Sequence, residues 1–114
     1  MMEISVHDKQ QLLSQRAIDK AESRAIASFA KFGQTVKSVE IRVQDVNGPR
    51  GGVDQECCIL VRLQKANDVA VTVTDDSLSK AIPGAINRAA RSVSRLLDRR
   101  SREAGRLSKF SFEV

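Results

Sequence analysis

The segment from residue 76 to residue 103 constrains the fold most strongly, because its side chains divide between one apolar and one basic side. At about 100° per residue, the apolar residues share one side of a helix: Ile82, Ile86, Ala89, Ala90, Val93, Leu96 and Leu97. The opposite side carries an arginine row over roughly five turns, made of Arg88, Arg91, Arg95, Arg99, Arg102 and Arg106. The pattern predicts a long helix whose apolar side covers a sheet.

Capping residues and helix breakers set the expected limits of this helix. Asp76 or Ser77 can cap its start, and Gly105 can end it. Pro83 lacks the backbone N–H of a helical residue and clashes with the preceding turn. We therefore expect either that the helix begins near Ile82 or that its first turn is kinked.

Three segments with alternating apolar and polar residues precede this helix. They span residues 39–44, 57–64 and 69–74. A glycine-rich turn region over residues 45–54 joins the first two, and a short connection joins the last two. A period of two is typical of strands with one buried face, so the pattern predicts three strands paired as an antiparallel meander.

The N-terminal part of the chain predicts a strand followed by a helix. Residues 2–6 alternate, and Asp8 can cap a helix that runs to about Lys31 and ends at Gly33. An apolar stripe repeats every four residues along it: Leu13, Ala17, Ala21, Ala25 and Phe29. A basic stripe borders the apolar one and contains Arg16, Lys20 and Arg24, and Lys31 falls on the same line seven residues further on.

The element order is therefore β-α-β-β-β-α, which defines an α+β fold. The strand–helix–strand start favours a first strand parallel to its neighbour. We expect a four-stranded sheet with both helices packed on one face, as in double-stranded-RNA-binding folds. The length of 114 residues supports one domain, over residues 1–104. Residues 105–114 would form a C-terminal tail, either a short strand or a loose arm.

The distribution of charge indicates a polyanionic partner. The formal net charge is +5, but residues 78–109 alone carry nine Lys or Arg and only two acids. The rest of the chain is slightly acidic. A solvated helix face is usually mixed in sign, whereas this one is not. Twelve of the nineteen basic residues are arginine, whose planar group suits phosphate.

The basic side chains of the two predicted helices form the candidate RNA-binding site. They are Arg16, Lys20, Arg24, Arg88, Arg91, Arg95, Arg99 and Arg102, with Arg50 as a possible loop contact. Almost no Asn, Gln or aromatic residue lies among the arginines to read base edges, which favours recognition of structured RNA by its shape. A helix lying on a membrane surface is the competing use of such a segment, and its small apolar side fits a sheet better.

Several classes of protein are excluded. No apolar run approaches the ~18 residues of a transmembrane helix, and the N-terminus lacks the pattern of a signal peptide, so we expect a cytoplasmic protein. One histidine, His7, and two adjacent cysteines, Cys57 and Cys58, are too few for a zinc finger or a disulfide framework. No catalytic constellation is present, so we expect neither an enzyme nor a cofactor, a metal or a small-molecule substrate.

The chain resembles the ribosome hibernation promoting factor family, which includes the ribosome-associated inhibitor. The likeness covers about residues 2–103 and rests on the element order, the 45–54 loop and the last helix. In that helix the matching positions are Ala81, Ile82, Ile86, Arg88, Arg91, Arg95 and Arg99. The chain departs from the family pattern at Ser79, where an aromatic residue is usual, and at Pro83.

The resemblance implies a translation inhibitor of stationary phase or stress. It implies binding to ribosomal RNA of the small subunit near the decoding centre, where the protein would block the sites of messenger and transfer RNA. We expect a monomer off the ribosome. The alternative is a small basic interaction module that binds another structured RNA or an acidic protein.

Overall fold

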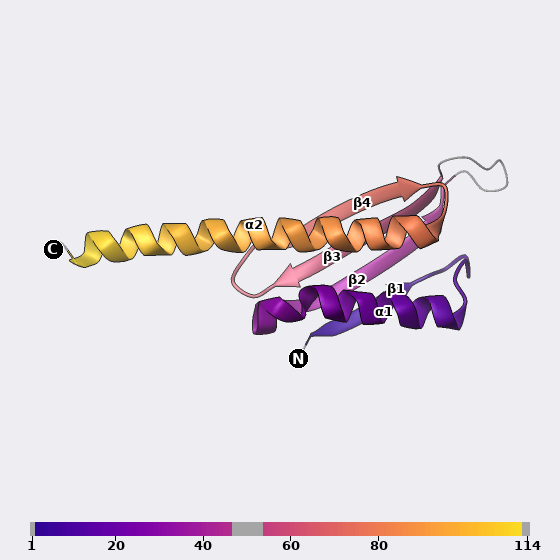
Figure 1. Cartoon of the computed structure of the whole chain (residues 1–114), viewed down its shortest axis with the longest axis horizontal. Helices are drawn as coiled ribbons and strands as arrows, with labels where there is room; N and C mark the ends of the chain where they lie inside the picture. The colour runs from indigo at the N-terminus through magenta and orange to yellow at the C-terminus, as the bar shows by residue number, and fades with distance from the viewer. Residues whose placement is uncertain (1, 47–53, 113–114) are drawn as a thin grey trace.

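The computed structural model describes residues 2–46 and 54–112, with side chains described as far as Ser101. The predicted element order is confirmed, with one added 3-10 helix, η1 (Figure 1). The elements are β1 (Glu3–His7), α1 (Gln15–Phe29), η1 (Ala30–Thr35), β2 (Val36–Asp45), β3 (Gln55–Leu63), β4 (Val69–Asp75) and α2 (Leu78–Phe112).

The four strands form one mixed sheet in the order β1-β2-β3-β4. β1 is parallel to β2, and the other two pairs are antiparallel, as predicted. Both helices lie on the same face of the sheet, side by side (Figure 1). The α+β fold with two helices on one face is therefore confirmed.

Alternation along the strands places the core between the sheet and the helices. Ile41 pairs with Ile59, which pairs with Val71 on the next strand. Ile41 and Ile59 are fully buried, and they meet the buried residues Ile86 and Val93 of α2 in one apolar cluster. The helix pattern and the strand pattern thus predicted the two halves of one core.

The start of α1 differs from the prediction. Asp8 does not cap the helix, since its carboxylate accepts hydrogen bonds from Leu12 N at 2.9 Å and Leu13 N at 2.8 Å in the preceding loop. The N-cap is Ser14, whose Oγ accepts from Ala17 N at 3.1 Å. Gln11 in the same loop adopts a positive φ of 56°, which interrupts any helix begun at Asp8.

The start of α2 agrees with the predicted cap, whereas its end differs from the prediction. The helix begins at Leu78, directly after Ser77, and contains Pro83. It passes through Gly105 to Phe112, so an end near residue 103 and a terminal strand were wrong. A single glycine costs a helix only about 1 kcal/mol relative to alanine and need not end it. The predicted boundary between residues 104 and 105 lies inside this helix, and the division into domain and tail stays a prediction.

Helix α2 gives the molecule its elongated shape. The longest dimension is 65 Å, against 27 and 17 Å for the other two. The C-terminal part of α2 extends beyond the sheet, while its N-terminal part covers β3 and β4 (Figure 1). The sheet therefore supports the part of α2 that carries Arg88, Arg91 and Arg95.

Candidate nucleic-acid interface

The basic stripe of α1 lines a groove between the two helices. Arg16, Lys20 and Arg24 are exposed and lie along one wall of this groove. Its volume is about 600 Å³, and α2 contributes Ile82 and Pro83 to it. Repeats of four residues put the three cations on one side of α1, and the burial of Ala21 and Ala25 turns that side toward the groove.

The arginine row of α2 faces solvent along the described part of the helix. Arg88, Arg91, Arg95 and Arg99 are all exposed. Among the described residues, none of the four forms an ion pair, and neither do the three cations of the α1 stripe. The helical face of the molecule therefore presents seven cations without a carboxylate partner in the described part of the chain.

Lys31 lies between the basic stripe of α1 and the arginine row of α2. A second depression between the helices, of about 420 Å³, is lined by Lys31 and Ser28 from the α1 side and by Arg91 and Ser94 from α2. The Lys31 ammonium lies 5.2 Å from the centre of the Phe32 ring, a distance at which the ring attracts the cation. The α1 stripe thus continues past Phe29 and meets the arginine row.

A further basic pair was missed by the sequence prediction. Lys65, in the turn after β3, lines a shallow depression together with Arg100 of α2. Both side chains are exposed. Arg100 lies on a different side of α2 from the arginine row, because it directly follows Arg99 in the sequence. Lys65 is far from Arg100 in sequence. No periodic signal could have paired them, because only the packing of α2 over the β3–β4 turn brings them together.

Two cations on the open face of the sheet share one carboxylate, whereas the cations of the α1 stripe and the arginine row have none among the described residues. Glu40 on β2 lies between Arg42 at 3.6 Å and Arg62 at 3.8 Å. The register places Arg42 on the same strand and Arg62 on the neighbouring β3. The positive field of the described residues is therefore concentrated on the helical face.

Two predicted site residues cannot be placed by their side chains. Arg50 lies in the segment 47–53, outside the described residues. Arg102 lies within α2, but its side chain is outside the described part. Their roles as RNA contacts stay predictions.

Cys57 and His7 have ordinary structural environments. Cys57 is fully buried, and burial raises the pKa of its thiol to about 12, with smaller contributions from Cys58 and Glu56. The imidazole of His7 contacts Ser5 Oγ at 3.3 Å on the surface. No group of three or more potential metal ligands occurs among the described residues.

The sheet occupies the apolar side of α2. Ile86, Ala89 and Val93 are fully buried in the core, so they are not available to a lipid surface. In the part of the chain that the structure describes, no helix is long and apolar enough to cross a membrane. The burial of Ile86, Ala89 and Val93 argues against the interpretation of α2 as a membrane-surface helix.

The arrangement defines a small α+β domain whose two helices form a basic surface on one face of a sheet. No family model matches the sequence, and no curated protein matches it. The fold is similar to the crystal structure of the N-terminal domain of protein Y from Thermus thermophilus, with a TM-score of 0.66 and 18% sequence identity. That match covers 83% of this chain and 98% of the other.

A ribosomal subunit interface protein from Coxiella burnetii has a similar structure as well. Its TM-score is 0.63 at 12% identity, over 83% of this chain and 96% of that protein. The chain thus has the fold of the hibernation promoting factor family that its sequence resembles. At sequence identities of 18% and 12%, the likeness to these two structures is one of fold.

Proposed function

We propose that this protein is a ribosome-binding factor that inhibits translation by occupying ribosomal RNA. The observation that carries the proposal is the row of unpaired cations on the helical face, on a fold similar to that of a ribosomal subunit interface protein. Exposed like charges repel one another, and a surface of this kind is best tolerated when a polyanion is the normal neighbour.

The mode of binding is recognition of RNA shape through phosphates. Arginine matches phosphate oxygens with two parallel hydrogen bonds, and five of the exposed cations on the described part of α2 are arginines. The depression between the helices lets Lys31 of η1 and Arg91 of α2 contact one RNA backbone. We infer that the small subunit near its decoding centre is the site, where the protein would exclude messenger and transfer RNA. The protein acts by occupancy, without catalysis.

Co-sedimentation with ribosomes tests the proposal. Binding should be detected at low salt and should weaken steeply as salt rises, since each phosphate contact adds close to one unit to the slope of log affinity against log salt. Absence of association at low salt would contradict the proposal. Treatment with ribonuclease should release the protein, and retention after complete digestion would indicate a protein partner instead.

Charge reversal in the arginine row should remove binding. For Arg91→Glu with Arg95→Glu, we expect affinity for ribosomes to fall on the order of a hundredfold, because two contacts become repulsive. The melting temperature should stay equal or rise slightly, since the new carboxylates lie near Arg88 and Arg99. The same change at Lys20 and Arg24 should weaken binding on the order of tenfold, because Asp19 and Glu22 already lie nearby.

A matched control separates local contact from net charge. Lys9→Glu with Lys37→Glu changes the formal charge by the same amount at exposed positions away from α2. We expect this control to bind ribosomes nearly as well as the unchanged chain. If the Arg91/Arg95 variant binds like the control, the arginine row only keeps the protein soluble. If that variant unfolds, the arginines have a structural role.

A further inference from the structure

The outer edge of β4 is a free sheet edge. β4 is the last strand in the sheet order and pairs only with β3 among the described residues. Alternate backbone N–H and C=O groups along it therefore point away from the sheet. Seven residues in regular register with β3 make this edge long enough for a further strand.

Along residues 69–74, β4 carries no feature that discourages pairing, and its one charged residue is Asp75 at the end of the strand. Residues 69–74 contain no charged residue and no proline, and their pairing with β3 has no bulge. The opposite edge, β1, has five residues and carries Glu3 and His7 at its two ends. Natural sheets use charge, proline or bulges to prevent a further strand from adding to an edge. Six consecutive residues without them leave this edge open to pairing.

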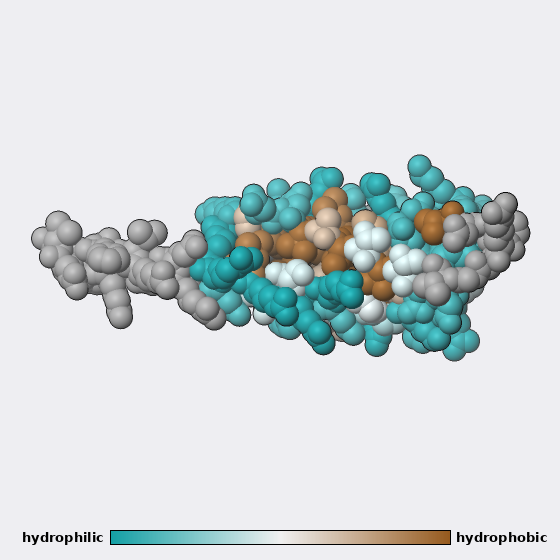
Figure 2. All heavy atoms as spheres, turned by 90° about the horizontal axis from the view of Figure 1, so that it is seen from above, coloured by the Kyte–Doolittle hydropathy of each residue, from teal (hydrophilic) through white to brown (hydrophobic). Residues whose placement is uncertain are grey.

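An apolar strip runs along the same edge. Val69, Val71 and Val73 point toward the helical face and are only half-buried, because no strand lies beside them. Figure 2 views the molecule from the β4 side and shows apolar surface gathered between two hydrophilic bands. A fifth strand would bury these valines with one of its own faces.

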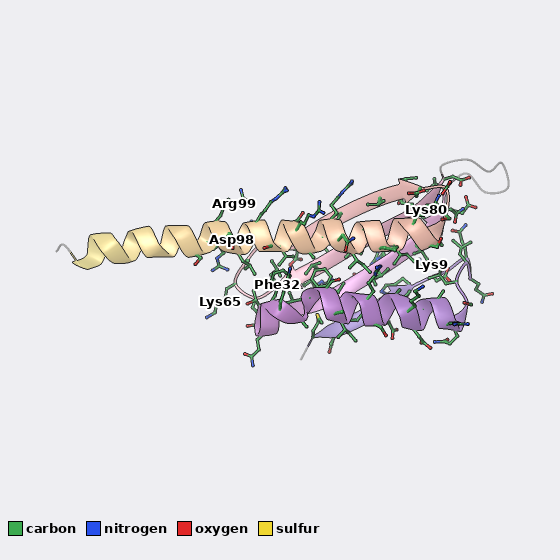
Figure 3. All side chains as sticks on the ribbon, viewed as in Figure 1. Lys9, Phe32, Lys65, Lys80, Asp98 and Arg99 are labelled. Atoms are coloured by element: carbon green, nitrogen blue, oxygen red, sulfur yellow. The ribbon has the colours of Figure 1, made fainter. Side chains whose placement is uncertain are left out.

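The arginine row borders this strip. Gly84 of α2 lies against β4, where a Cβ at that position would be 3.7 Å from Val73 Cγ1. Arg88 and Arg95 follow Gly84 by four and eleven residues, so they lie on the same side of the helix. Figure 3 shows Arg99 pointing from α2 to the side on which β4 lies. The free edge of β4 therefore lies next to an apolar strip, and exposed arginines lie beside that strip.

We propose that β4 binds an extended acidic peptide segment of a partner protein as a fifth strand. Backbone hydrogen bonds to β4 would supply pairing, the valines would pack against apolar residues of the segment, and Arg88, Arg95 and Arg99 would attract its carboxylates. A second copy of the chain fits less well, because a two-fold pairing of β4 would bring two arginine rows together. RNA also fits less well, because valine offers no surface for base stacking. The proposal does not rest on ribosome binding, although it uses three arginines that the proposed function assigns to RNA.

A synthetic peptide can test this directly with the full chain. The probe is a fluorescein-labelled seven-residue peptide in which glutamate and valine alternate, matched in length to β4. Binding is measured by fluorescence anisotropy, and amide hydrogen exchange by NMR locates the site. We expect alternate amides of β4, those not bonded to β3, to gain protection on the order of tenfold or more.

Control peptides and variants separate strand pairing from simple charge attraction. Replacing the valines of the probe by proline keeps every glutamate but prevents strand pairing, and should abolish the protection of β4. Arg88→Gln with Arg95→Gln should lower the affinity for the probe on the order of tenfold. Lys9→Gln with Lys37→Gln should leave this affinity unchanged. Equal binding of the proline peptide, or protection only along α1, would overturn the proposal.

A second copy of the chain and an RNA would each give a distinct result in the hydrogen-exchange measurement. Protection of β4 that rises with protein concentration and without peptide would assign the edge to a second copy. Protection of β4 by a short single-stranded RNA would assign it to nucleic acid. Either result overturns the acidic-peptide proposal.

Discussion

At the scale of single residues, Cys57 and Cys58 show how strand geometry separates neighbours. They are adjacent in β3, so their side chains point to opposite faces of the sheet. Cys57 faces the helices and is fully buried, whereas Cys58 lies half-buried on the open face, between Arg42 and Thr72 in the register. The two thiols therefore differ in accessibility, even though their chemistry is the same.

The raised pKa of Cys57 predicts a loss of stability at alkaline pH. The unfolded thiol ionises near its ordinary value of 9.0, while the folded thiol stays protonated up to about 12. The stabilisation is fully present below pH 9 and is lost above it, by up to about 1.4 kcal/mol per pH unit. Urea denaturation at pH 8, 9 and 10 measures this loss. Cys57→Ala should lose less stability over the same range, and an identical slope would contradict the prediction.

At the scale of elements, local hydrogen bonds fix where α1 begins. Asp8 and Ser14 are both good N-cap residues, yet only Ser14 lies directly before the helix. The carboxylate of Asp8 instead holds the loop through the N–H groups of Leu12 and Leu13. This loop sets the position of α1 relative to β1 and hence the direction of Arg16, Lys20 and Arg24.

Removal of the Ser14 cap should destabilise the fold measurably. Ser14→Ala leaves the N–H of Ala17 without its side-chain acceptor and should lower the free energy of unfolding by about 1 kcal/mol. Ser23→Ala is the matched control, because Ser23 is exposed in the interior of the same helix. Alanine there should be neutral or slightly stabilising. Urea denaturation of both variants checks the difference, and equal stabilities would rule out Ser14 as the cap.

At the scale of the whole molecule, the two faces of the sheet differ in charge, and the helices cover only one of them. The helical face holds the unpaired cations, and the open face holds Glu40 between two arginines. α2 extends the helical face beyond the sheet (Figure 1). The last residues of α2 in the core cluster are Leu96 and Leu97, so the described core ends where the sheet ends.

A chain truncated after residue 104 should therefore fold normally. We expect its melting temperature to lie within about 2 °C of that of the full chain, because the described core loses no member. Thermal melting followed by circular dichroism measures this, and the helical signal should fall in proportion to the residues removed from α2. A melting temperature lower by about 8 °C or more would show that the final segment contributes to the fold, and that the predicted boundary of the domain is wrong.

The sequence by itself determined the elements, their order and the side of each helix that carries charge. These depend on local periodicity: a period of two along residues 69–74, and helical spacing for Arg88, Arg91 and Arg95. A side chain's face on a strand or helix follows from its position in that period, with no knowledge of distant residues. The buried positions Ala21, Ala25 and Phe29 follow from the same rule.

The tertiary structure alone decided which groups from different elements meet. Lys65 and Arg100 share a depression, Lys31 and Arg91 share another, and Glu40 on β2 pairs with Arg62 on β3. It also decided that β4 keeps a free edge. Such contacts depend on register and on the angle at which α2 crosses the sheet, and the packing of the whole core sets both.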